Sequence, residues 1–598
     1  MKQLHQPELT PNALETLKRR YLSHDESGAV LETPADLFLR VAEAIAGVEK
    51  KWGASEAEIR SLAESFYELM AKRLFLPNSP TLMNAGRELG QLSACFVLPV
   101  EDSMEGIFET LKSAAMIHKT GGGTGFSFSR LRPKGSRVAS TNGVASGPVS
   151  FMKVFNTATE AVKQGGARRG ANMGVLRIDH PDILEFIACK IVVSEVANFN
   201  ISVAVTDSFM QALEQNTLYP LIDPQTEAQY KNNGVPVALR AADVWNDLVN
   251  AAWSAGEPGI VFIDRMNASN PTHAIESIEA TNPCGEQPLP PYDSCNLGSV
   301  NLGAFTHKSG NSWDFDWEEL RNVIQLAVRF LDNVVEANRY PIPQIREQSL
   351  ANRRIGLGVM GWADALAMMQ LPYNSEAAYD LGERVFAFFD MEGKRASSKL
   401  AEQRGVFPNW GKSTHCPHMK LRNATVTTVA PTGTISIIAG CSSGIEPFFA
   451  VSYVRTVMDG TRLVEINPLF ERVARARGFY SDALMARVAR QNSIQDMAEI
   501  PADTRALFRV AADLGPEEHL RMQAVFQKNC DSSVSKTINL PASATRDVVD
   551  RAYREAWRLG LKGVTVYRDR SRPGQVLATG GPDAGVPDNG PDCGHLAC

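Results

Sequence analysis

Three side chains with complementary chemistry lie at alternate positions in one short segment, Asn282-Pro-Cys-Gly-Glu286. Its proline and glycine, with Pro288 just beyond, exclude a regular helix or central strand, so we predict a tight loop. If that loop is extended, the side chains of Asn282, Cys284 and Glu286 share one face. An amide, a thiol and a carboxylate could then serve as hydrogen-bond donor, reactive sulfur and proton acceptor. A buried structural cysteine in a turn is the competing interpretation.

Two further cysteines lie in apolar segments. Cys295 follows Cys284 by eleven residues, and Cys95 lies far upstream in the stretch Leu92–Pro99. Each is near the end of a predicted strand, where the active-site residues of α/β proteins gather. Spacing alone does not say that Cys95 and Cys295 meet, and two unrelated core cysteines are the commoner case for any such pair.

Several segments have the composition of phosphate-binding turns. Ala430-Pro-Thr-Gly-Thr-Ile-Ser436 follows the apolar stretch Thr425–Val429, and small residues after a strand suit a helix N-terminus with free N–H groups. Asn78–Thr81 and Gly121–Gly125 are similar in kind. No Walker motif is present at either, and most glycine-rich segments are simply turns.

Two further segments have the composition of flexible loops, one basic and one with two cysteines. Lys163–Asn172 places Arg168 and Arg169 among glycines, which suits either closure on a phosphate or base edge or a plain surface loop. The Gly- and Pro-rich end of the chain carries Cys593 and Cys598 with one histidine between them. A zinc site would need a second ligand pair nearby, so we expect no protein-bound metal ion.

The elements that must position these residues change in character along the chain. The first 75 residues have helical periodicity, with a proline-initiated start at Thr33-Pro34 and a capping box from Ser55 to Glu58. From about residue 76, short apolar strands alternate with helices such as Trp317–Asn338, which predicts an α/β fold with largely parallel sheet. We therefore expect a helical domain at 1–75, a catalytic domain at 76–574 and a flexible tail at 575–598.

Composition restricts the class of protein. The chain has 598 residues, 44% hydrophobic and 21% charged, with a formal net charge of -6 and no basic run typical of nucleic-acid binding. No stretch approaches the roughly 18 unbroken apolar residues of a membrane span, and no signal peptide is evident. Nine cysteines are sparse for this length, which argues against a disulfide scaffold and favours the cytoplasm.

Together these segments resemble the catalytic chain of ribonucleotide reductases. The combination of Asn-Pro-Cys-Gly-Glu at 282–286, a cysteine eleven residues later and Pro-Thr-Gly-Thr at 431–434 is highly specific. The matches run from Asn78-Ser-Pro-Thr81 to Tyr567-Arg-Asp-Arg-Ser-Arg572, more than four fifths of the chain. The resemblance implies a ten-stranded α/β barrel of two five-stranded parallel halves, threaded by a central finger loop.

The resemblance also implies roles for the reacting residues. Cys284 would carry a thiyl radical that removes the 3′ hydrogen of the ribose. Glu286 would take the 3′-hydroxyl proton, and Asn282 would hold the substrate. Cys95 and Cys295 would become a disulfide as the 2′-hydroxyl leaves as water, which yields deoxyribonucleotides for DNA synthesis.

Further residues are expected to bind ligands or relay electrons in such an enzyme. The resemblance assigns substrate binding to Ser79, Ala94, Gly123, Pro431, Thr432, Gly433, Thr434 and Ile435. It makes Gln164, Arg168 and Arg169 part of a loop that links a dNTP or ATP effector site to the substrate base. Cys593 and Cys598 would pass electrons from a thioredoxin- or glutaredoxin-type reductant, and a homodimer is expected.

The radical generator divides this family into three classes. Oxygen-dependent enzymes use a partner subunit and two adjacent tyrosines near the C-terminus, whereas here Tyr567 stands alone in Val-Thr-Val-Tyr-Arg. The glycyl-radical motif of the anaerobic enzymes is absent. Lys562–Arg568 resembles the C-terminal pattern of the class II enzymes, which use adenosylcobalamin, so this cofactor is expected.

Three alternatives stay open at this point. One is a barrel protein that binds nucleotides for regulation without catalysis, although it would not need all three cysteines. Another is a reductase with a different radical generator. The third is a dithiol oxidoreductase acting through Cys593 and Cys598, although their spacing is not that of a Cys-x-x-Cys unit.

Overall fold

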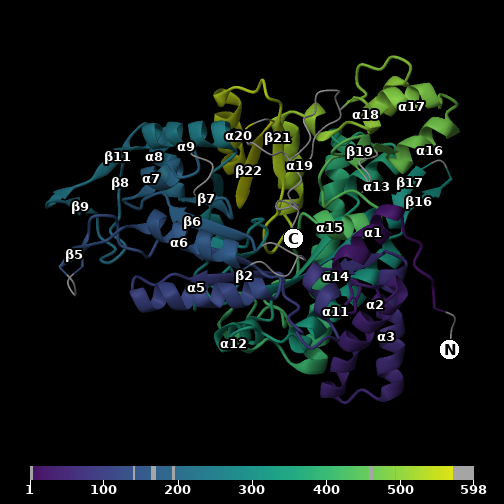
Figure 1. Cartoon of the computed structure of the whole chain (residues 1–598), viewed down its shortest axis with the longest axis horizontal. Coiled ribbons are helices and arrows are strands. Elements are labelled where there is room, and N and C mark those ends of the chain that lie inside the picture. The colour runs from purple at the N-terminus through teal and green to yellow at the C-terminus, as the bar shows by residue number, and fades with distance from the viewer. Residues whose placement is uncertain are drawn as a thin grey trace.

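The computed structural model describes residues 4–138, 142–162, 170–191, 196–310, 312–456, 462–491, 493–569 and 571. Its central feature is one large sheet with helices packed around it (Figure 1). Within the described part of the chain, no helix is long and apolar enough to cross a membrane.

The first half of the sheet is five parallel strands. They follow one another in the order β2 (Cys95–Pro99), β3 (Gly123–Ser127), β6 (Asn172–Arg177), β7 (Phe199–Val205) and β12 (Gly259–Phe262). Helices α5 (Met104–Lys119), α6 (Pro148–Ala161) and α9 (Ala241–Ala255) connect them and share their core. The crossover helices explain why neighbouring strands are parallel.

The second half is built in the same way. Strand β15 (Ser294–Asn301) pairs in parallel with β18 (Ile355–Met360), and β21 (Thr537–Leu540) pairs in parallel with β22 (Gly563–Arg568). Between them, residues 427–429 make parallel bridges from Leu357 to Thr427 and from Val429 to Val534. The predicted strand at 425–429 is therefore present as a pairing segment, but too few of its residues pair to form a regular strand.

Antiparallel seams close the two halves into a barrel. Strand β15 runs antiparallel to β2, and β22 runs antiparallel to β12. The short β1 (Phe75–Pro77) adds to the outer part of β15. The prediction of a ten-stranded barrel made of two five-stranded parallel halves is confirmed.

The N-terminal helices are those that the sequence predicts. Thr33 caps α2 (Pro34–Ala46) and Ser55 caps α3 (Glu56–Ala71), each through a capping box. Together with α1 (Pro11–Arg20) they share one hydrophobic core with α11 (Trp317–Ala337) and α14 (Glu376–Arg404) (Figure 1). They pack directly against the second half of the barrel.

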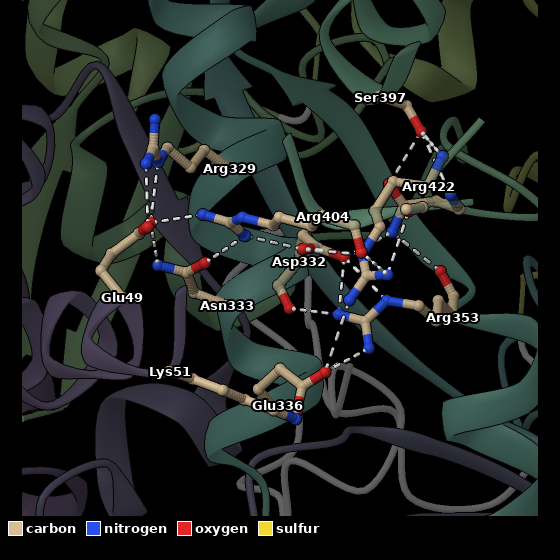
Figure 2. Close-up of polar contacts among 12 residues, drawn as sticks. Glu49, Lys51, Arg329, Asp332, Asn333, Glu336, Arg353, Ser397, Arg404 and Arg422 are labelled. Carbon is tan, nitrogen blue, oxygen red and sulfur yellow. Dashed lines mark hydrogen bonds and ion pairs between the residues drawn. The ribbon is translucent and has the colours of Figure 1, made fainter. Parts of the chain in front are cut away.

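A buried ion network joins the helical region to the barrel (Figure 2). Asp332 on α11 is fully buried and receives Arg353 at 2.7 Å and Arg404 at 2.8 Å. Arg404 also reaches Glu49 at 2.5 Å, and its guanidinium lies 4.0 Å from the centre of the Trp52 ring. Because each carboxylate has several donors, the network offsets its own desolvation and fixes how the two regions dock.

The other helices cover the sheet or extend from it. They are α4 (Ser79–Asn84), α7 (Ile183–Ala188), α8 (Asp207–Glu214), α10 (Ile263–Ala268), α12 (Pro343–Asn352), α13 (Trp362–Met368), α15 (Gly433–Ala439), α16 (Pro468–Ala476), α17 (Asp482–Val488), α18 (Ala502–Leu507), α19 (Pro516–Gln527) and α20 (Arg546–Arg558). Thr545 precedes α20, and its side chain makes no capping hydrogen bond.

Candidate active site

The segment that carries Cys284 is a hairpin loop. Strands β13 (Ala280–Thr281) and β14 (Pro288–Leu289) pair antiparallel and hold residues 282–287 between them. The Gly285 N–H donates to the Asn282 carbonyl at 3.1 Å, and Gly285 has φ +82. Only glycine adopts that conformation without strain. The loop is therefore a tight turn, and the extended form that would align Asn282, Cys284 and Glu286 on one face is not found.

Glycines on β3 let this hairpin approach the barrel wall. A Cβ atom on Gly125 would lie 1.8 Å from the Thr281 carbonyl oxygen, and one on Gly123 would lie 3.0 Å from Pro283 Cγ. On β7, two strands further along the sheet, the Asn200 amide donates to the Pro283 carbonyl at 2.9 Å. Only the first part of the predicted turn at Gly121–Gly125 is a turn, because residues from Gly123 onward form strand β3, whose glycines make room for the loop. Phosphate binding at this segment stays a prediction.

Cys95 and Cys295 lie directly opposite each other across the β2–β15 seam. Both side chains are buried, and the structure holds both as thiols. Directly opposed residues of antiparallel strands have Cα atoms about 4.5–5.5 Å apart, which falls inside the range that a disulfide spans. The structure therefore brings together two cysteines whose pairing the sequence left open.

The loop places its amide and carboxylate against this pair. Asn282 Nδ2 donates to Cys95 Sγ at 3.2 Å, and Cys95 Sγ lies 3.9 Å from Glu286 Oε1. Asn282 and Glu286 are fully buried, whereas Cys284 at the tip is partly exposed and lines a cavity. A proton acceptor, an amide donor and three sulfurs thus share one region, and Cys284 is the sulfur that a bound molecule reaches.

Burial governs the protonation of the opposed cysteines. It raises the pKa of the Cys295 thiol well above its usual value, and the negative charge of Asp293 adds to that shift. Asp293 is itself held at 2.8 Å by Arg354, which also reaches Glu276 at 3.0 Å. Cys295 is therefore a neutral thiol, the form that can give up a hydrogen atom or a proton together with an electron.

The cavity beside Cys284 has a volume of about 2260 Å³. Pro431, Gly433 and Thr434 line it, at the start of α15 as the sequence predicted. Thr432 is buried behind them, has φ 53 and accepts the Gly444 N–H at 2.7 Å through its hydroxyl. The turn before α15 is therefore held by the hydrogen bond between Thr432 and Gly444.

The other predicted substrate residues are buried around this cavity rather than in its wall. Ala94 and Gly123 lie on adjacent segments joined by a 2.8 Å main-chain hydrogen bond. Ser79 begins α4 and its hydroxyl meets the Tyr21 hydroxyl at 2.7 Å, and Ile435 lies within α15. Contact of these four with a nucleotide stays a prediction.

Two predicted groups lie outside the described residues. These are the loop residues Gln164, Arg168 and Arg169, and the tail cysteines Cys593 and Cys598. Sequence reasoning also missed residues that hold the loop at 282–287, namely Asn200, Thr428 and Ser533. No local signal marks them, because their partners are main-chain groups far away in the sequence.

The cavity also has room for more than a nucleotide. A pocket for one drug-sized ligand typically measures about 300–1,000 Å³, which this cavity exceeds. Its wall combines Cys284 with polar side chains of both barrel halves, such as Ser202, Asn539 and Thr565. The volume therefore exceeds what one such ligand needs, and Cys284 lies in the wall of this space.

Comparison with known proteins defines the family. The family model "Ribonucleotide reductase, all-alpha domain" matches residues 7–90, and the model "Ribonucleotide reductase, barrel domain" matches residues 93–421 and 418–567. These matches cover most of the chain, and they agree with the observed fold. The chain belongs to the ribonucleotide reductase family.

Individual relatives extend over nearly the whole chain. The "Vitamin B12-dependent ribonucleoside-diphosphate reductase" of Thermoplasma acidophilum is 47% identical over 635 residues, which cover 97% of this chain and 81% of that protein. A Mycobacterium tuberculosis protein of the same description is 47% identical over 571 residues, covering 95% and 81%. The solved "Actinobacillus ureae class Id ribonucleotide reductase alpha subunit" has a TM-score of 0.76 at 23% identity, covering 94% of this chain and 97% of that one, which supports the fold.

Proposed function

We propose that this chain reduces ribonucleoside diphosphates to 2′-deoxyribonucleoside diphosphates with adenosylcobalamin as its radical source. The observation that carries the proposal is 47% identity, over 97% of the chain, to a relative described as a vitamin B12-dependent ribonucleoside-diphosphate reductase. The segment Lys562–Arg568 agrees with it, because this segment resembles the C-terminal pattern of the adenosylcobalamin-dependent enzymes.

Cys284 is the residue that starts the reaction in this proposal. Adenosylcobalamin, when bound, supplies the unpaired electron that a protein side chain cannot generate unaided. Cys284 then removes the 3′ hydrogen atom of the ribose as a thiyl radical and returns a hydrogen atom at the end. Its position at the loop tip, in the cavity wall, supports this role.

The groups behind Cys284 complete the chemistry. Glu286 accepts the 3′-hydroxyl proton, and Asn282 orients the substrate through its amide. The 2′-hydroxyl leaves as water, which takes one proton to balance its charge. Cys95 and Cys295 give two electrons and two protons and become a disulfide, so each deoxyribonucleotide formed is matched by one disulfide and one water.

Substrate phosphates bind at the turn that begins α15. The N–H groups of Gly433, Thr434 and Ile435 start a helix at the cavity wall and suit an anion. We expect Ser79, Ala94 and Gly123 to complete the nucleotide site. The 163–172 segment, with Gln164, Arg168 and Arg169, would carry the signal of a dNTP or ATP effector to the substrate base.

Partners follow from the same assignment. Thioredoxin or glutaredoxin would reduce Cys593 and Cys598, which in turn would reduce the Cys95–Cys295 disulfide, and this cycle places the protein in the reducing cytoplasm. Exposed apolar side chains on α5 and α6, among them Phe108 (47% exposed), Met116 (44%) and Val154 (38%), support a homodimer. Loss of thioredoxin-supported but not small-dithiol turnover in a Cys593→Ser, Cys598→Ser variant would support the relay, and equal loss with both would count against it.

An anaerobic assay tests the proposal directly. Purified protein, a nucleoside diphosphate and a dithiol are incubated with and without adenosylcobalamin, and deoxyribonucleotide is measured. We expect product only with the cofactor and none in Cys284→Ser. Turnover without cobalamin, or undiminished turnover in Cys284→Ser, contradicts the proposal. Nucleotide binding without any turnover favours a regulatory barrel protein instead.

A further inference from the structure

Lys562 is a buried lysine that the reaction does not use. It immediately precedes β22, and its residue is only 7% exposed. Its carbonyl accepts the Phe262 N–H at 2.9 Å, so its main chain lies at the antiparallel seam between the two halves of the barrel. A buried ammonium needs specific partners to offset its desolvation.

Three successive main-chain carbonyls supply those partners. Lys562 Nζ lies 2.6 Å from the Ser532 oxygen, 2.7 Å from the Asp531 oxygen and 3.3 Å from the Cys530 oxygen. An ammonium group has three N–H donors, so three converging carbonyls saturate it. The turn at 530–532 is thus shaped as a monovalent-cation site that the chain fills with its own lysine.

Other contacts of this turn hold the catalytic loop. The Ser533 N–H donates to the Glu286 carbonyl at 2.9 Å, and Thr428 Oγ1 donates to the same carbonyl at 3.0 Å. Ser532 Oγ lies 3.4 Å from the Gln287 side-chain oxygen. The peptide after Glu286 is therefore fixed by the turn that Lys562 ties to β22.

The charge of Lys562 is suited to this task. Burial lowers the pKa of the ammonium, while the nearby Cys530 and Asp531 oppose that shift. The Asp531 carboxylate is itself engaged by the Val426 N–H at 2.8 Å and by Lys394 at 3.1 Å. A neutral side chain at 562 would take this donor from the Cys530 and Asp531 carbonyls and leave the Ser532 carbonyl only the Gln527 amide at 3.2 Å, so the turn would have to rearrange.

We propose that Lys562 is a positioning residue, whose ammonium occupies a three-carbonyl cation site and thereby fixes Glu286 and the loop that carries Cys284. This inference rests on the proposed function for what Glu286 and Cys284 do once positioned. It also predicts that a small alkylammonium ion can replace the side chain when that is truncated.

The test uses the full chain with Lys562→Ala, with and without n-propylammonium chloride. A misplaced reacting group costs on the order of 100-fold in rate, so we expect kcat to fall about 100-fold with little change in the KM for nucleotide. Without cofactor or substrate, iodoacetamide should alkylate Cys284 faster than in the wild type, as read by peptide mass spectrometry. Propylammonium should reverse both changes, whereas tetramethylammonium, which has no N–H donor, should not.

Two further variants keep the test decisive. Thr428→Val removes the second donor to the Glu286 carbonyl. We expect a smaller fall in kcat and a smaller rise in the rate of Cys284 alkylation than in Lys562→Ala. This variant also provides a test if Lys562→Ala does not fold. Lys528→Ala is the matched control, because Lys528 is an exposed lysine in the same region that pairs with Glu383. Normal kcat and normal Cys284 alkylation in both Lys562→Ala and Thr428→Val overturn the proposal, as does failure of propylammonium to restore a folded Lys562→Ala. Alkylation needs no cofactor, so it still tests positioning if the wild type shows no reductase activity.

Discussion

Replacing Glu286 by glutamine changes the chemistry of the catalytic loop and leaves its shape in place. The Glu286 side chain is fully buried, and its carbonyl is held by the Ser533 N–H and the Thr428 hydroxyl, neither of which depends on the carboxylate. Glutamine has the same number of heavy atoms and keeps an oxygen for the contact with Cys95 Sγ. What it loses is the ability to accept a proton.

The size of the effect follows from that loss. General base catalysis contributes about 10²–10⁴-fold in rate, which corresponds to about 3–5 kcal/mol of transition-state stabilisation. We therefore expect kcat to fall by that factor, with the KM for nucleotide and the melting temperature nearly unchanged. Since the Glu286 charge also helps to raise the pKa of Cys295, that pKa should move down in the variant.

The assay is anaerobic turnover with a dithiol, run beside thermal unfolding. Glu279→Gln is the matched control, because Glu279 lies on the same segment but pairs with Arg130 away from the sulfurs. A Glu286→Gln enzyme whose kcat stays within about twofold of the wild type refutes the reasoning, since no general base would then be missing. Equal loss in both variants would show that any change in this segment disrupts the fold.

Two stability predictions concern residues away from the loop. Asp332→Asn should lower the free energy of unfolding by about 3–5 kcal/mol in urea titrations, because it leaves Arg353 and Arg404 buried without their shared carboxylate. Lys51 is an exposed member of the same network and pairs with Glu336, so Lys51→Ala should lower the free energy of unfolding by less than about 1 kcal/mol. Equal losses of stability in Asp332→Asn and Lys51→Ala would contradict a role for burial. Burial lowers the pKa of His118 to about 4, below its ordinary 6.5, so its stabilising contribution is present above pH 6.5 and is lost as the pH falls toward 4. Between pH 7 and pH 5 the wild type should lose about 2 kcal/mol more than His118→Gln, and parallel pH profiles would contradict this.

Local sequence signals predicted much of the scaffold. Thr33 and Ser55 start helices because their side chains cap nearby N–H groups, which depends only on neighbouring residues. Strand β7 and helix α11 are likewise evident from their apolar periodicity. The segment at 425–429 was harder, because its pairing is parallel and comes from partners far along the chain.

The active site was harder to predict from the sequence for the same reason. Nothing near Cys95 or Cys295 says that they face each other, since their pairing depends on closure of the barrel at the β2–β15 seam. Gly123 and Gly125 looked like a phosphate turn because glycine serves both turns and close approaches, and only the hairpin packed against β3 distinguishes them. Lys562 belongs to the segment Lys562–Arg568 that resembles the family, but its contacts could not be predicted, since its partners are carbonyls about 30 residues upstream, which any residue type provides.

One stoichiometry tests the central claim that Cys284, Cys95 and Cys295 act as one site. Reduced protein with Cys593→Ser and Cys598→Ser is mixed anaerobically with adenosylcobalamin and a nucleoside diphosphate, without any added reductant. The account predicts one deoxyribonucleotide for each active site, and one Cys95–Cys295 disulfide detected by peptide mass spectrometry. Product formed while both cysteines remain thiols, or a disulfide that pairs either of them with another cysteine, would contradict it.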